Sequence, residues 1–92
     1  MALQFEWDSE KAAINIRKHG VSFEVAANVF YDEKRIEIFD EMHSIEEDRY
    51  ITIGSANDIL FVVYTERSPK IRIISARLAT ARERKIYYGG NI

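Results

Sequence analysis

The sequence predicts a small α+β domain in which helices pack on one face of an antiparallel sheet. Hydrophobic residues recur at helical spacing over 9–20 and 23–30, and then alternate with a period of two in four segments within 34–77. With 92 residues, of which 47% are hydrophobic, the chain has the size of one domain with one modest core. We therefore expect a single domain over residues 1–92, in the order β-α-α-β-β-β-β-α.

The first third of the chain predicts a short strand and two capped helices. Residues 2–7 are apolar enough for a strand, and Asp8 follows where a carboxylate caps the free amides of a helix. That helix should end at Gly20, because glycine tolerates the left-handed conformation of a C-cap. Ser22 is placed to cap a second helix over residues 23–30. We expect the apolar face of the first helix to contain Ala12, Ile16 and His19.

The alternating segments predict four strands, over residues 34–40, 49–55, 59–66 and 71–77. Their connections are short, which favours antiparallel neighbours. The segment 59–66 is apolar on both faces at its centre, so we place it inside the sheet. Thr80 and Glu83 have the spacing of a capping box, which predicts a last helix over residues 81–88. Two helices cover only one face, so the other face is left for a ligand or a partner.

Charge is unevenly distributed along the chain. Residues 1–66 carry 6 Lys and Arg against 14 Asp and Glu, whereas residues 67–92 carry 7 Lys and Arg against one acid, Glu83. The net charges of −8 and +6 give the total of −2. A basic segment in an acidic protein suggests a surface for an anionic partner such as nucleic acid. The alternative is that the two segments neutralise each other in the folded protein.

Composition disfavours several classes of protein. Cysteine is absent, so the chain has no disulfide framework and no cysteine nucleophile. The two histidines lie 24 residues apart in different predicted elements, which is not a metal-binding spacing. No apolar segment is long enough to span a membrane, and the first residues lack the pattern of a signal peptide. We therefore expect a cytoplasmic protein that needs neither a metal nor another cofactor.

Three arginines of the basic segment are candidates for binding phosphate, namely Arg72, Arg77 and Arg82. A planar guanidinium binds phosphate oxygens through two parallel hydrogen bonds and stays charged at physiological pH. In a regular strand Arg72 and Arg77 point to opposite faces, so a bulge is needed before both face one ligand. We expect a carboxylate to turn Arg82 back toward the sheet. The alternative for each arginine is an ion pair that serves only the fold.

Glu66 and His43 are candidates for orienting a cation or moving a proton. Glu66 ends the predicted central strand, where it can orient an arginine or act as a weak base. His43 lies in the polar loop before residues 49–55, and its imidazole can carry protons near neutral pH. Either can instead be an ordinary solvated side chain. We favour Glu66 as the more important, because a strand holds geometry more rigidly than a loop.

The sequence resembles the BrnT toxins over almost its whole length. The resemblance rests on the segments FEWDSEKAAINIRKHGVSFEVAANVFYD, EDRYITIG and VVYTERSPKIRIISARLATARERKIYY. It implies a RelE-like ribonuclease of a type II toxin–antitoxin system, which cleaves RNA and inhibits translation. It also implies a ribbon-helix-helix antitoxin of the BrnA type, through which the toxin reaches operator DNA. The positions that match the family are Glu66, Arg72, Arg77, Arg82 and Glu83, with His43 in the loop where the family tends to carry a histidine.

The implied chemistry is attack of an RNA 2′-hydroxyl on the neighbouring phosphorus. A base must take the proton, an acid must protonate the leaving 5′-oxygen, and cations must stabilise the phosphorane. Arginines suit the last role without a metal. Two other functions stay open from the residues alone: a module that binds nucleic acid or an acidic partner without cleavage, and a co-repressor that acts only within an antitoxin complex.

Overall fold

Helices and strands follow one another mainly in separate runs, two helices and then four strands, as expected for an α+β protein, and this fold class is confirmed. The computed structural model describes residues 2–89. No helix within this range is long and apolar enough to cross a membrane. The elements are β1 (Gln4–Glu6), α1 (Ser9–His19), α2 (Phe23–Asn28), the 3₁₀ turn η1 (Val29–Tyr31), β2 (Ile36–Phe39), the 3₁₀ turn η2 (Glu41–His43), β3 (Tyr50–Ala56), β4 (Asp58–Arg67), β5 (Lys70–Leu78) and α3 (Ala81–Tyr87).

The strands form one five-stranded sheet in the order β1-β5-β4-β3-β2. The apolar segment of β4 is central, as predicted. The prediction of a wholly antiparallel sheet is wrong at one edge, because β1 pairs with β5 in parallel, from Gln4 opposite Lys70 to Glu6 opposite Arg72. Short connections dictate antiparallel pairing only between consecutive strands, and the chain between β1 and β5 contains two helices that allow a parallel return.

Local signals in the sequence set the ends of the helices. The Asp8 carboxylate accepts hydrogen bonds from two amides in the first turn of α1, and Gly20 ends that helix at φ 70°. Ser22 caps α2 through its side chain. Thr80 and Glu83 form the predicted capping box at the start of α3, each side chain accepting from the other residue's amide. These interactions involve residues close in sequence, which is why the sequence revealed them.

The buried side of α1 differs from the predicted one. Asn15 is 5% exposed, whereas Ile16 is 49% exposed and His19 is also exposed. Asn15 Nδ2 donates to the carbonyl oxygens of Val21 at 2.9 Å and Ala76 at 2.8 Å, and its Oδ1 accepts from the Ala76 amide at 3.2 Å. The side-chain amide of Asn15 thus bonds to both backbone groups of Ala76, as a peptide of a neighbouring strand would. Ala76 lies beyond the residues of β5 that pair with β1.

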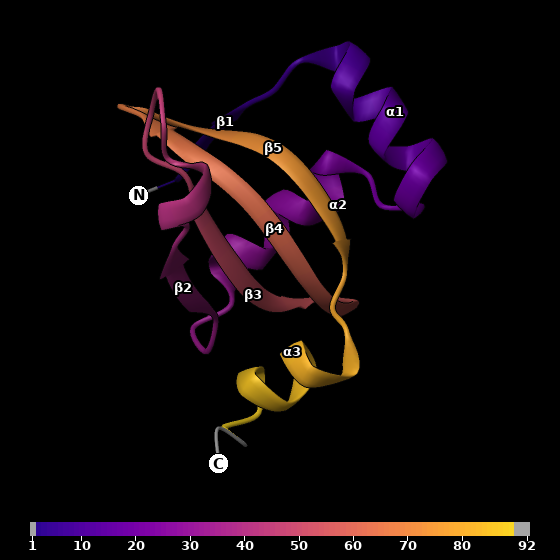
Figure 1. The fold of residues 1–92 in the computed structure, drawn as a ribbon. Coiled ribbons are helices and arrows are strands. Elements are labelled where there is room, and N and C mark those ends of the chain that lie inside the picture. The colour runs from indigo at the N-terminus through magenta and orange to yellow at the C-terminus, as the bar shows by residue number, and fades with distance from the viewer. Residues whose placement is uncertain (1, 90–92) are drawn as a thin grey trace.

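The two faces of the sheet are covered differently, as Figure 1 shows. On one face α2 crosses behind the sheet, and Phe23, Val29, Val62 and Tyr64 form part of the buried core there. On the other face the connection that contains η2 lies in front of the strands at one end, and α3 lies toward the opposite end. Between them, side chains such as Phe61 and Val63 are half-buried on this second face, whereas Ile53 beside Phe61 is buried.

The helix α3 is fastened to the sheet by a polar contact near its end. The Tyr87 hydroxyl donates to Asp32 Oδ2 at 2.6 Å, and the same oxygen accepts from the Ser55 amide at 2.8 Å. Burial opposes ionisation of Asp32, but the hydrogen bonds it accepts hold its pKa below the usual value. The hydrogen bond to this carboxylate, together with burial, raises the pKa of Tyr87 to about 12.

We expect Tyr87→Phe to lower the free energy of unfolding by about 1 kcal/mol at neutral pH, since one hydrogen bond is lost. A pKa raised on folding stabilises the protein fully below the ordinary tyrosine value of about 10, and this stabilisation is lost as pH rises toward the folded value. Urea unfolding should therefore show a difference between the two proteins that shrinks above about pH 10. Tyr88→Phe is the matched control, because the Tyr88 side chain is largely exposed. A difference that persists undiminished at the highest pH would contradict this interpretation.

Candidate active site

A hollow of about 310 Å³ lies on the sheet face opposite α2. Apolar side chains of three adjacent strands form its floor, and the connection between β2 and β3 forms a wall. The floor consists mainly of Ile51, Phe61, Val63 and Ile74, and the wall presents Asp40, His43 and Arg49. The hollow therefore combines a rigid, apolar base with ionisable groups from one loop.

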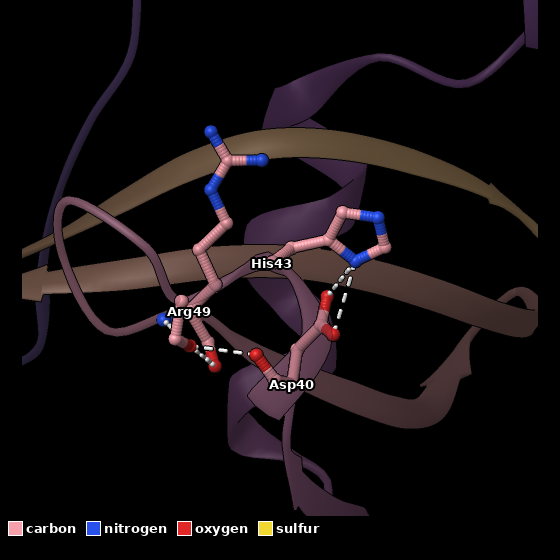
Figure 2. A network of polar contacts seen from close by, with 4 residues as sticks. Asp40, His43 and Arg49 are labelled. Carbon is pink, nitrogen blue, oxygen red and sulfur yellow. Dashed lines mark hydrogen bonds and ion pairs between the residues drawn. The ribbon is translucent and has the colours of Figure 1, made fainter.

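Ser44 closes the loop that carries these groups. Its hydroxyl donates to the Asp40 carbonyl oxygen at 2.6 Å and accepts from the Arg49 amide at 2.8 Å. The Asp40 amide also donates to the Arg49 carbonyl oxygen at 2.9 Å. The two ends of the loop are thereby linked, and Figure 2 shows Asp40, His43 and Arg49 gathered in front of the strands.

Asp40 orients the imidazole of His43. The Nδ1 atom of His43 lies 3.1 and 2.9 Å from the two carboxylate oxygens of Asp40. The Asp40 side chain is 14% exposed and that of His43 is 62% exposed, so a shielded acid holds an accessible ring. A carboxylate at Nδ1 favours the proton on that nitrogen, which leaves Nε2 of the neutral ring as a proton acceptor. This is the arrangement of an oriented general base.

Arg49 adds a cation beside this pair. Figure 2 shows its guanidinium extending from the end of the loop on the same side of the sheet as the imidazole. Among residues 2–89, no hydrogen bond or ion pair engages the guanidinium. Its donors are therefore available to a ligand, and a guanidinium binds phosphate oxygens well.

Sequence reasoning missed Asp40 and Arg49, because it looked for the site in the basic last third of the chain. One signal was present: Asp40 precedes His43 by three residues. In the 3₁₀ turn η2 side chains three apart eclipse each other, so this spacing brings carboxylate and imidazole together. No comparable pattern marks Arg49, since Ser44 places it through the shape of the loop.

Arg72 and Arg77 lie on the same face as the hollow. Thr65 pairs with Arg72 and Phe61 with Arg77, and the register shifts beside Val63. This is the bulge that sequence reasoning required before both arginines could share a face. The two pairs are nevertheless four positions apart along β4, a distance of about 13 Å, so the arginines do not converge on one point.

Both arginines are paired with carboxylates. Arg72 contacts Glu6 at 3.1 Å, and Arg77 makes a bidentate pair with Glu83 at 2.8 and 3.0 Å. The hydrogen bonds from Arg77 hold the pKa of Glu83 below its usual value, although burial opposes this shift. The alternative of mutual neutralisation therefore applies to much of the basic segment. Two further ion pairs on the surface, Arg67 with Glu47 and Arg84 with Asp58, neutralise other arginines of this segment.

Comparison with known proteins assigns the chain to a family. A family profile described as "Ribonuclease toxin, BrnT, of type II toxin-antitoxin system" matches residues 7–83. The chain belongs to the BrnT toxin family. The 1.1 Å crystal structure of the Brucella abortus ribonuclease toxin, BrnT, matches with a TM-score of 0.64 and 25% sequence identity, over 86% of this chain and 99% of that chain. No curated protein sequence matches.

Membership of the BrnT family makes this chain an endoribonuclease toxin of a type II toxin–antitoxin system, with an antitoxin as its partner. His43, with its oriented imidazole, and Arg49, which has no partner among residues 2–89, both line the hollow beside η2. The same two residues also line a second hollow, together with Ile45, Glu46 and Glu47. Glu47 is paired with Arg67, but the carboxylate of Glu46 would repel a phosphate chain there, so the first hollow suits RNA better.

Glu66 does not make the contact that sequence reasoning expected of it in this BrnT toxin. It is exposed at the end of β4, opposite Ile71, and borders a hollow shared with Glu47 and Asp48. No arginine within residues 2–89 pairs with it, so the expectation that it orients an arginine is wrong. The neighbouring arginines point elsewhere because the sheet register gives them other carboxylates. A catalytic role for Glu66 stays a prediction.

Arg82 also departs from its expected setting. It is exposed on α3, and no described carboxylate contacts it, because the acid that follows it, Glu83, pairs with Arg77 instead. The prediction that a carboxylate turns Arg82 toward the sheet is wrong. Within residues 2–89, His, Asp and Glu side chains form no group of three that could hold a metal ion.

Proposed function

We propose that this BrnT toxin cleaves RNA in the hollow beside η2, with His43 as general base. Asp40 holds the ring, and Nε2 takes the proton of the 2′-hydroxyl as the oxygen–phosphorus bond forms. Arg49 donates to the phosphate oxygens and stabilises the phosphorane. The bond to the 5′-oxygen then breaks, water in the open hollow protonates this oxygen, and a 2′,3′-cyclic phosphate remains. The observation that carries the proposal is the shielded Asp40 at 2.9 Å from an exposed imidazole.

The reaction we propose needs no metal ion. The histidine supplies the base, and the arginine supplies the positive charge that a metal would otherwise bring to the phosphorane. Arg72, Arg82 and Glu66, which match the family, lie outside this hollow and would act on the RNA chain farther from the reacting atoms. Cleavage that persists in excess EDTA supports this part of the proposal, and cleavage abolished by EDTA and restored by Mg²⁺ overturns it.

The finer identity of the partner is also a proposal. We propose a ribbon-helix-helix antitoxin of the BrnA type, a RelE-like mode of translation inhibition in the cytoplasm, and contact with operator DNA only through the antitoxin. The resemblance of three segments, which span most of the chain, to BrnT toxins supports this. The domain spanned by residues 1–92 would act as a single unit in that complex.

Arg49→Ala tests the site directly. We expect single-turnover cleavage of an oligoribonucleotide to fall by about tenfold to thirtyfold, because one phosphate-directed charge is lost from the transition state. Arg17→Ala is the matched control, since Arg17 is an exposed arginine in the last turn of α1 and should leave the rate unchanged. Wild-type protein that binds RNA without cleaving it would favour the binding module instead. A wild-type rate in Arg49→Ala would move the site elsewhere.

A further inference from the structure

We propose that Arg77 is a stacking platform for a nucleobase of the RNA substrate, and not a phosphate ligand. The inference rests on the proposed function of the hollow, and it adds a base-binding subsite at the border of that hollow. Three features of Arg77 carry it: the ring beneath the guanidinium, the carboxylate at its edge, and its partial exposure.

The guanidinium rests on an aromatic ring that belongs to the hollow. The Cζ atom of Arg77 lies 3.9 Å from the centroid of the Phe61 ring, which is stacking distance. Phe61 is the cross-strand partner of Arg77 and also lines the hollow. The platform is therefore continuous with the floor of the proposed site.

The edge of the guanidinium is held by protein groups. NH1 donates to Glu83 Oε1 at 2.8 Å and to the Leu78 carbonyl oxygen at 3.2 Å, while NH2 donates to Glu83 Oε2 at 3.0 Å. Glu83 is itself fixed, because Oε1 also accepts from the Thr80 amide at 2.8 Å in the capping box. The start of α3 thus locks the guanidinium in place, and such pre-organisation reduces the entropy cost of binding a planar ligand.

The same contacts argue against a phosphate ligand. The Arg77–Glu83 pair has no net charge, and a phosphate at this edge would meet the carboxylate of Glu83. Arg49 carries no such partner among the described residues and is the better phosphate ligand. The Arg77 side chain is nevertheless 34% exposed, so part of it faces solvent. Arginine planes stack on unpaired RNA bases, which is how proteins commonly recognise single-stranded RNA.

The test compares Arg77→Lys with wild type on two oligoribonucleotides, one intact and one with an abasic nucleotide beside the cleavage site. Lysine keeps the charge and loses the plane. We expect kcat/KM on the intact RNA to fall by about tenfold, chiefly through KM, as expected for one lost stacked base. On the RNA that is abasic at the stacked position, the kcat/KM of wild type should fall to that of Arg77→Lys. The kcat/KM of Arg77→Lys should be nearly the same on both RNAs. Abasic nucleotides on either side of the cleavage site locate that position.

Arg72→Lys is the matched control, because Arg72 lies on the same face and pairs with Glu6, but no described aromatic ring lies under it. It should lower kcat/KM equally, if at all, on intact and abasic RNA. If Arg77→Lys has the kcat/KM of wild type on both RNAs, only the charge at this position matters. If it lowers kcat/KM equally on both RNAs, the role of Arg77 is structural. Either result overturns the platform.

A binding measurement separates this inference from the proposed mechanism. In a His43→Ala background, binding should quench the fluorescence of RNA that carries 2-aminopurine at the stacked position. Adding Arg77→Lys should remove most of that quenching. If wild type does not cleave RNA, the proposed mechanism is wrong. The fluorescence measurement still tests whether Arg77 stacks on a base, because it requires binding and not cleavage. Equal quenching with arginine and lysine in proteins shown to be folded would reject it.

Discussion

His43→Ala should lower the rate of RNA cleavage by about a hundredfold or more, because the 2′-hydroxyl loses the base that takes its proton. The ring is exposed, so its loss should not disturb the fold. Asp40→Asn should lower the rate less, by about tenfold, since it keeps the imidazole but loses the carboxylate that favours a proton on Nδ1. The measurement is single-turnover cleavage of one oligoribonucleotide, with circular dichroism on each variant.

The other histidine of the chain provides a control for this result. His19 lies at the end of α1 and is exposed, and His19→Ala should leave cleavage unchanged. Glu66→Gln should be mild. A severe Glu66→Gln beside an active His43→Ala would restore the preference that the sequence alone suggested.

Our proposal departs from that preference because of contacts that the sequence pattern alone does not reveal. The rigidity argument for Glu66 was sound, but the register of the sheet gave it no arginine to orient. The loop of His43 was expected to hold geometry less rigidly than a strand, yet Ser44 links its two ends. A polar loop does not reveal from composition alone which of its hydroxyls will bridge its ends.

The same contrast runs through the rest of the fold. The helix caps at Asp8 and Ser22 and the capping box of α3 were predictable, because each depends on residues within one turn. The central place of β4 followed from its apolar pattern. The pairing of Arg72 with Glu6, 66 residues away, depends on β1 joining the sheet in parallel. No local signal indicates such a partner, so charge alone left two interpretations open.

Asn15→Ala should give the largest loss of stability, about 3 kcal/mol in the free energy of unfolding. Asn15 makes three hydrogen bonds while only 5% exposed, and each is worth about 1 kcal/mol. Alanine would also leave both backbone groups of Ala76 and the carbonyl of Val21 without these partners. For a chain of this size the melting temperature should fall by roughly 15 °C. Thermal and urea unfolding followed by circular dichroism measure the change.

Two variants define what this loss means. Asn28→Ala is the matched control, because Asn28 is exposed at the end of α2, and it should change stability by less than about 0.5 kcal/mol. Asn15→Asp keeps an acceptor for the Ala76 amide but places a carboxylate beside two carbonyl oxygens, so it should be at least as destabilising as alanine. A loss below about 1 kcal/mol in Asn15→Ala would mean that water or β1 replaces the amide.

The position matters for function as well, because Ala76 directly precedes Arg77, and α1 therefore helps to fix the strand that carries the proposed base platform.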